Sequence, residues 1–190
     1  MEGIHQAVEY LRAGEVVGVP TDTVYGVAAD PHDPAAVAAL FIIKGRRDTK
    51  PIGLLVANVE VALAMVALPL YAVEWTRVYW PGSLTLVAKS NSTLPKGVGD
   101  RRLRSVGVRV PDHPVTLALL QAFGPLAVTS ANLAGGPETL DESAARITFG
   151  DQVPFYLPGT CPGATASTVV DVTRHRPRIL RAGPIDLGLR

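Results

Sequence analysis

Side chains that suit recognition of a small polar ligand follow an apolar stretch at residues 15–19. Residues 20–26 read Pro-Thr-Asp-Thr-Val-Tyr-Gly, so two hydroxyls, a carboxylate and a phenol fall within five residues. A hydroxyl both donates and accepts hydrogen bonds, and such a loop after a strand can hold a ligand in an α/β fold. The simpler interpretation is a turn closed by a side-chain bond from Asp22.

A compact group of cations follows the expected helix over residues 35–44. Its four members lie within seven residues and are Lys44, Arg46, Arg47 and Lys50. A triphosphate needs such neutralisation, with lysine acting as a point charge and arginine as a planar fork. Two simpler interpretations stay open: favourable cations at a helix C-terminus, and a solvated run of charge.

Other polar groups lie within or at the ends of apolar strand patterns. Arg109 lies inside the apolar segment 106–110, where a buried guanidinium must face a carboxylate or a phosphate. A structural ion pair would also satisfy it. Ser130 and Asn132 follow the segment 126–129, Ser167 precedes the segment 168–172, and Arg181 ends the segment 178–181. Each could contact a ligand, or could serve only as a cap or turn.

The elements that must position these groups alternate between helical and strand patterns. Helices are expected near residues 4–11 and 35–44, in two pieces over 59–79 split near Pro69, and over 114–123 and 141–149. Strands are expected at 15–19, 52–57, 84–89, 106–110, 126–129, 168–172 and 178–181. This alternation predicts an α/β fold with a mixed sheet and, without an internal linker, one domain over residues 1–190.

The segment 91–104 differs from the rest, because it is polar, lacks periodicity and carries Arg101, Arg102 and Arg104. Long loops inside compact domains often act as lids or binding loops, so this segment is the candidate lid.

Composition and absent motifs exclude several classes of protein. With 18 Lys and Arg against 17 Asp and Glu, the net charge of +1 excludes a globally basic nucleic-acid binder. Cys161 is the only cysteine, so no intrachain disulfide and no cysteine-based zinc site are possible. The four histidines lack metal-ligand spacing, and no Walker, dinucleotide or nucleophile-elbow motif occurs. No apolar run is long enough to span a membrane, and a cytoplasmic location is expected.

Taken together, these segments resemble the YrdC-like family of threonylcarbamoyl-AMP synthases. The matching runs occur in family order over nearly the whole chain: 20–26, Lys44-x-Arg46 with Lys50-Pro51, 80–85, 107–111, Ser130-x-Asn132, 167–171 and Leu180-Arg181-x-Gly183. The resemblance implies a twisted mixed sheet flanked by helices, with a concave, positively charged cavity. Because the chain stops soon after Gly183, it resembles the short, single-domain type without a C-terminal extension.

The resemblance also implies a reaction. L-Threonine, bicarbonate and ATP give threonylcarbamoyl-AMP and pyrophosphate, and partner proteins transfer the threonylcarbamoyl group to adenosine in tRNA. Mg²⁺ would enter with ATP, held mainly by the phosphates. Transfer proteins are the implied partners, and tRNA itself is a further candidate.

Site residues carry over by position. The family's tetrad corresponds to Lys44, Arg46, Ser130 and Asn132. ATP is expected to contact Arg46, Lys50, Ser105, Asn132 and Arg181, with Lys44 also neutralising phosphate charge, and threonine to contact Thr23, Tyr25, Arg109, Ser130 and Ser167. The chain departs from the family at Arg47, where proline is frequent, and at Leu55, where some members have histidine.

Two alternatives remain open from the sequence. The first is an RNA-binding module of the same fold, motivated by the arginines of the 91–104 segment and the cations of 44–50. The second is an enzyme that forms a carbamoyl adenylate, since YrdC-like domains also occur in carbamoyl transfer.

Overall fold

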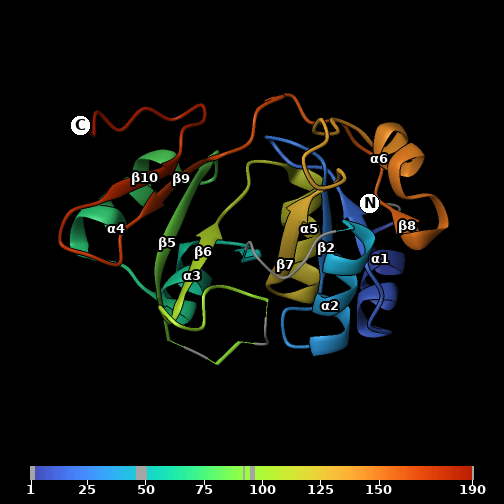
Figure 1. The fold of residues 1–190 in the computed structure, drawn as a ribbon, viewed down its shortest axis with the longest axis horizontal. Coiled ribbons are helices and arrows are strands. Elements are labelled where there is room, and N and C mark those ends of the chain that lie inside the picture. Colours follow the sequence, from blue (N-terminus) through green and yellow to red (C-terminus); the bar gives the residue numbers. More distant parts are fainter. Residues whose placement is uncertain (1–2, 46–50, 92, 95–96, 190) are drawn as a thin grey trace.

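The structure is a computed structural model that describes residues 3–45, 51–91, 93–94 and 97–189 (Figure 1). Its α-helices are α1 (Ile4–Arg12), α2 (Pro34–Ile43), α3 (Val59–Met65), α4 (Leu70–Tyr79), α5 (Pro114–Phe123) and α6 (Glu142–Phe149), with a 3-10 turn at Gly150–Gln152. Its strands are β1 (Val17–Val19), β2 (Gly26–Ala29), β3 (Gly53–Leu55), β4 (Val66–Ala67), β5 (Leu84–Ser90), β6 (Ser105–Arg109), β7 (Leu126–Ser130), β8 (Phe155–Tyr156), β9 (Thr168–Asp171) and β10 (Arg178–Arg181).

All ten strands belong to one sheet, in the order β10-β9-β5-β6-β3-β7-β2-β1-β8, with β4 paired to β5. Three neighbouring pairs are parallel, namely β1 with β8, β3 with β6 and β5 with β9, and the others are antiparallel. The predicted mixed sheet flanked by helices is therefore confirmed.

The start and the end of helix α2 are set by local sequence signals, and Lys44 follows its last residue. The carboxylate of Asp33 accepts hydrogen bonds from the amides of Ala35 and Ala36, and Pro34 occupies the first helical position, where its missing N–H costs nothing. Gly45 has φ of 60°, a left-handed conformation in which glycine is favoured, and it ends the helix directly after Lys44. The expected helix over 35–44 is thus confirmed to within one residue.

The helices cover the sheet in separate places and leave one part of it open. Helices α1 and α5 pack together over β1 and β7, while α3 and α4 lie over β5 and β6, where Leu86 and Val108 are fully buried (Figure 1). On the other face of β5 and β6, Thr85, Val87 and Gly107 are only partly buried, because successive side chains alternate between faces. This uncovered face forms one wall of the cavity described below.

Three strands were not predicted. β4 and β8 have two residues each, and β2 is four residues of Gly-Val-Ala-Ala buried on both faces, so it shows no alternation. Over the described part of the chain, no helix is both long enough and apolar enough to cross a membrane.

Candidate active site

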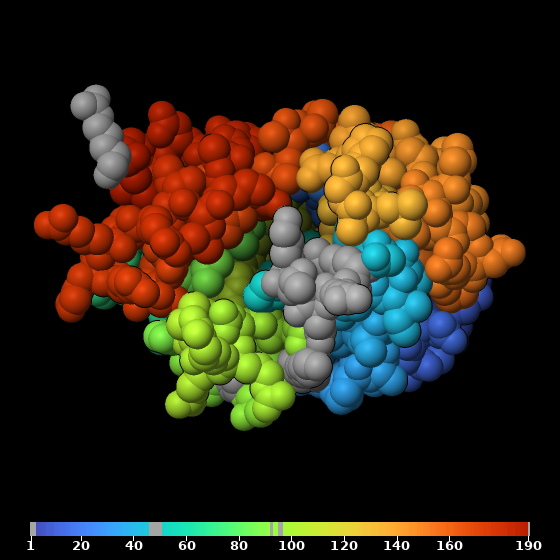
Figure 2. Space-filling view, viewed as in Figure 1, coloured from blue at the N-terminus to red at the C-terminus, as the bar shows by residue number. Residues whose placement is uncertain are grey.

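A cavity of about 690 Å³ opens between the two halves of the sheet. Figure 2 shows the hollow bordered by the C-terminal strands in red, the segment near residue 100 in lime and the segment near residue 135 in gold. Eight of the predicted site residues line it: Thr23, Lys44, Ser105, Arg109, Ser130, Asn132, Ser167 and Arg181. Segments separated by most of the chain therefore converge on one space, of a size usual for small-molecule sites.

Hydrogen bonds from Lys44 connect the end of α2 to the end of β7. Its Nζ donates to the carbonyl oxygens of Ser130 at 2.5 Å and Asn132 at 2.8 Å, and to Asn132 Oδ1 at 3.1 Å. Ser130 Oγ in turn donates to Asn132 Oδ1 at 2.6 Å, and Asn132 Nδ2 donates to the Gly136 carbonyl at 2.7 Å. Lys44 is 3% exposed, so this network fixes the Ser130-x-Asn132 turn from inside the protein.

Arg109 lies on β6 and is held by three partners. Its Nε donates to the Gly82 carbonyl at 2.9 Å, its Nη1 to Thr23 Oγ1 at 2.8 Å, and its Nη2 to the carboxylate of Asp22. Burial lowers the pKa of Arg109, and the adjacent Asp22 carboxylate opposes that shift. These bonds use three of the five N–H donors of a guanidinium, so an anion can still be bound at this end of the cavity.

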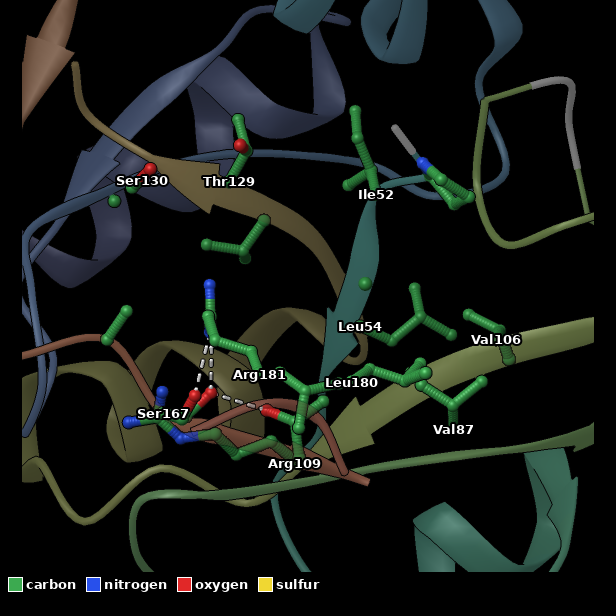
Figure 3. Close-up of a pocket in the computed structure, with 18 of the residues that line it drawn as sticks. Ile52, Leu54, Val87, Val106, Arg109, Thr129, Ser130, Ser167, Leu180 and Arg181 are labelled. Carbon is green, nitrogen blue, oxygen red and sulfur yellow. Dashed lines mark hydrogen bonds between the residues drawn. The ribbon is translucent and has the colours of Figure 1, made fainter. Parts of the chain in front are cut away.

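A second arginine reaches the cavity from β10. The Nε of Arg181 donates to the Ser167 carbonyl at 2.9 Å and its Nη2 to Ser167 Oγ at 3.0 Å, while Ser167 Oγ lies 2.8 Å from Thr85 Oγ1. Figure 3 shows Arg181 extending into the cavity above Ser167, with Ile52, Leu54, Val87 and Val106 on the apolar side. The cavity therefore has a polar end and an apolar end.

Charges of both signs line the cavity. The cations among the described lining residues are Lys44, Arg109, Arg178 and Arg181, and the carboxylates are Asp100, Glu138 and Asp171. Burial lowers the pKa of Arg181, whereas Glu138 raises it. The predicted positive charge of the cavity depends in addition on Arg46, Arg47 and Lys50, which lie outside the described residues.

Tyr25 does not occupy the predicted position. Its side chain is fully buried, it does not line the cavity, and its hydroxyl donates to the Leu157 carbonyl at 2.6 Å. Burial raises the pKa of Tyr25. The reason is that Tyr25 alternates in step with Val27 and Ala29 of β2, so it joins their core cluster and packs close to Gly18 of β1.

Sequence reasoning missed four residues of this site. Asp22 pairs with Arg109, and the other three, Thr21, Thr85 and Glu138, line the cavity. Asp22 and Thr21 belong to the 20–26 segment, but nothing in the local pattern shows which of its polar groups face Arg109. Thr85 could have been found from alternation in β5, because it faces away from the buried Leu84 and Leu86.

Comparison with known proteins identifies relatives over nearly the whole chain. The Sua5/YciO/YrdC family model, described as telomere recombination, matches residues 9–183. A Mycobacterium tuberculosis protein provisionally named threonylcarbamoyl-AMP synthase is 43% identical over 185 residues, which are 96% of this chain and 85% of that protein. The threonylcarbamoyl-AMP synthase of Vibrio cholerae is 34% identical, with 96% of this chain and 98% of that protein covered.

Solved structures agree with the fold. Pyrococcus abyssi Sua5 in complex with L-threonine superposes with a TM-score of 0.90 at 32% identity, over 95% of this chain and 54% of that one. Escherichia coli YciO superposes with a TM-score of 0.88 at 28% identity, over 97% of this chain and 90% of that one. This chain thus spans about half the length of the archaeal Sua5 protein and most of the length of YciO.

Proposed function

Because the chain belongs to the Sua5/YciO/YrdC family, we propose that it is a threonylcarbamoyl-AMP synthase. Its substrates are L-threonine, bicarbonate and ATP, and its products are threonylcarbamoyl-AMP and pyrophosphate. The observation that carries the proposal is the convergence of eight predicted site residues on one cavity. The threonine complex of a structural relative supports the choice of amino acid.

The reaction proceeds in two steps. The α-amine of threonine attacks bicarbonate, and loss of water gives a carbamate. A carbamate oxygen then attacks the α-phosphorus of ATP, forming an O–P bond while the bond from the α-phosphorus to the bridging oxygen breaks and pyrophosphate leaves. The enzyme is in this sense a nucleotidyltransferase. We assign no general base among the described lining residues, and propose that catalysis rests mostly on positioning and charge stabilisation.

We assign the amino acid to the polar end of the cavity. Arg109 binds the threonine carboxylate with donors that remain beyond its bonds to Gly82, Thr23 and Asp22. Thr23, which bonds to Arg109, and Ser130 and Ser167, which also line the cavity, contact the other polar groups of the amino acid. Tyr25 is not assigned a contact, because it lies in the core.

We assign ATP to the space between this end and the apolar wall. Arg46 and Lys50 neutralise the phosphates as pyrophosphate departs, while Lys44 orders the turn that presents Ser130 and Asn132. Ser105, Asn132 and Arg181 contact the nucleotide. We keep the segment 91–104, of which residues 92, 95 and 96 lie outside the described residues, as the candidate lid that would protect the labile carbamate from water.

Mg²⁺ fits this site only if most of its ligands are phosphate oxygens and waters, because the site offers few protein ligands. Among the residues that the structure describes, no three His, Cys, Asp or Glu side chains are grouped to hold a metal ion. Mg²⁺ commonly keeps several waters and binds through substrate phosphates with one or two carboxylates, for which Asp100, Glu138 and Asp171 are available on the cavity wall. Bound with ATP, the ion would neutralise phosphate charge.

The product serves partner proteins that transfer the threonylcarbamoyl group to adenosine in tRNA. We also propose that the chain acts as one domain in the cytoplasm. Arg101, Arg102 and Arg104 are exposed and adjoin Asp100, Leu103 and Ser105 of the cavity wall, and we assign any direct tRNA contact to these arginines.

The test is pyrophosphate release with each substrate omitted in turn. Release that requires ATP, L-threonine and bicarbonate together, with threonylcarbamoyl-AMP detected by mass spectrometry, supports the synthase. Release with carbamoyl phosphate in place of threonine and bicarbonate would instead indicate the carbamoyl-adenylate enzyme. Salt-dependent tRNA binding without any pyrophosphate release would indicate an RNA-binding module.

A further inference from the structure

Two buried threonines of the 20–26 segment form a short hydrogen-bond chain that ends in the cavity. Thr21 and Thr23 are 3% and 2% exposed, and both line the cavity beside Arg109. Thr21 is fixed from outside the segment by its amide, which donates to the Sγ of Cys161 at 3.3 Å. The hydroxyl of Thr21 has no role in the function proposed above.

The hydrogen bonds of Thr21 determine where its proton lies. A hydroxyl has one proton to donate and two lone pairs to accept with. Thr21 Oγ1 donates to the Val24 carbonyl at 2.7 Å and accepts from the Thr23 amide at 3.1 Å. Its remaining contact is Thr23 Oγ1 at 3.0 Å, and because its only proton is already used, it must accept in that bond.

The polarity of Thr23 follows from that of Thr21. Thr23 Oγ1 donates its proton to Thr21 and accepts from Arg109 Nη1 at 2.8 Å. Thr23 Oγ1 then has one free lone pair and no free proton. On the cavity side, Thr23 can therefore only accept a hydrogen bond, whereas the adjacent Arg109 can only donate.

We propose that Thr21 is a positioning residue that makes Thr23 an obligate hydrogen-bond acceptor for a donor group of the amino-acid substrate. This inference rests on the proposed function for the identity of the occupant. If Arg109 binds the substrate carboxylate, the substrate group that bonds to Thr23 must be an N–H or the side-chain O–H. A carboxylate oxygen at that place would face the lone pair of Thr23 Oγ1 and could not form a hydrogen bond. The neighbouring acceptor and donor thus set the orientation of the amino acid.

The test compares Thr21→Val, which removes the hydroxyl at constant shape, with Thr21→Ser, which keeps it. Dissociation constants for L-threonine are measured by calorimetry in the presence of ATP, so that binding is read independently of turnover. We expect Thr21→Val to weaken L-threonine binding about tenfold, because Thr23 is then free to turn its proton toward the ligand. Thr21→Ser should stay within about twofold of the wild type, and ATP binding should be unchanged in both.

Thr76→Val is the matched control, because Thr76 is also fully buried and donates to a nearby carbonyl, that of Val73 at 2.7 Å, but on α4 away from the cavity. It should leave L-threonine binding unchanged. The proposal would be overturned if Thr21→Val bound L-threonine with wild-type affinity, or if it lost affinity for ATP and L-threonine equally. It would also be overturned if the wild-type protein did not bind L-threonine. Wild-type binding of L-threonine without pyrophosphate release would reject the synthase alone.

Binding of L-valine, which carries a methyl in place of the threonine hydroxyl, shows which substrate group donates to Thr23. If Thr23 accepts from the O–H, Thr23→Val should reduce the preference for L-threonine over L-valine to near unity. If it accepts from the N–H, the same variant should weaken both ligands about equally. Unchanged binding of both ligands would overturn the proposal.

Discussion

The Nζ of Lys44 lies 2.8 Å from the carbonyl oxygen of Asn132, a residue 88 positions later in the sequence, and bonds to its side-chain oxygen as well. An ammonium group is a donor only, and both ends of the Ser130-x-Asn132 turn provide acceptors for it. Lys44 therefore holds this turn in place, in addition to the phosphate neutralisation proposed for it.

Replacing Lys44 by methionine should impair both stability and activity. The substitution removes charge-assisted bonds and leaves buried carbonyl oxygens without their donor, so we expect the free energy of unfolding to fall by about 2–4 kcal/mol. Denaturant unfolding measures this. Lys89→Met is the control, because the exposed Lys89 donates to one carbonyl, that of Leu103, and should change stability by less than about 1 kcal/mol. An equally small effect at Lys44 would contradict its structural role.

Replacing Arg46 by alanine should reduce turnover with little change in stability. A guanidinium that meets charge developing on the departing pyrophosphate is expected to contribute about a hundredfold or more to the rate. Pyrophosphate release at saturating substrates measures it, with the exposed Arg77→Ala on α4 as a charge-matched control. Turnover of Arg46→Ala equal to that of the control would remove Arg46 from the site.

Replacing Asp22 by asparagine should weaken threonine binding through Arg109. The pair is buried, with side chains 7% and 12% exposed, and loss of the carboxylate charge leaves the guanidinium uncompensated. We expect a loss of about 2 kcal/mol or more in stability and a KM for L-threonine raised at least about tenfold. Asp112→Asn, at an exposed neighbouring position, serves as the control. A raised KM for ATP alone would place Arg109 at the nucleotide instead.

His113 should make stability depend on pH. Burial lowers its pKa from the ordinary value of 6.5, and its Nδ1 is buried without a hydrogen-bond partner among the described residues. The unfolded chain therefore binds a proton more readily than the folded protein, so this contribution is fully present above pH 6.5 and is lost as the pH falls below it. The fall in melting temperature between pH 7.5 and pH 5 should be smaller in His113→Gln than in the wild type. Equal falls would contradict the assignment.

Local patterns were sufficient for the elements that carry strong signals. The helix over 114–123 and the strand over 178–181 occur with the predicted bounds, because proline marks the start of the helix and turn residues flank the strand. Strand β2 was missed because Gly-Val-Ala-Ala carries neither alternation nor β-branched enrichment, and its place depends on pairing with β1 and β7.

The site could be predicted only as a set of residues and not as an arrangement. The sequence identified Arg109 as needing an anionic partner, but the partner is Asp22, 87 positions away, and only the pairing of strands brings the two together. Tyr25 was misplaced for a related reason. Which face of the chain a residue presents depends on where the next strand begins, and no local pattern marked the start of β2.

In the proposed function, one cavity receives L-threonine and ATP together, and a crystal structure with L-threonine and an ATP analogue carrying a methylene α–β bridge tests this most directly. We expect the threonine carboxylate on Arg109, its donor group on Thr23, and the triphosphate chain directed toward the 44–50 segment. Either ligand bound outside this cavity, or a carboxylate directed away from Arg109, would contradict it.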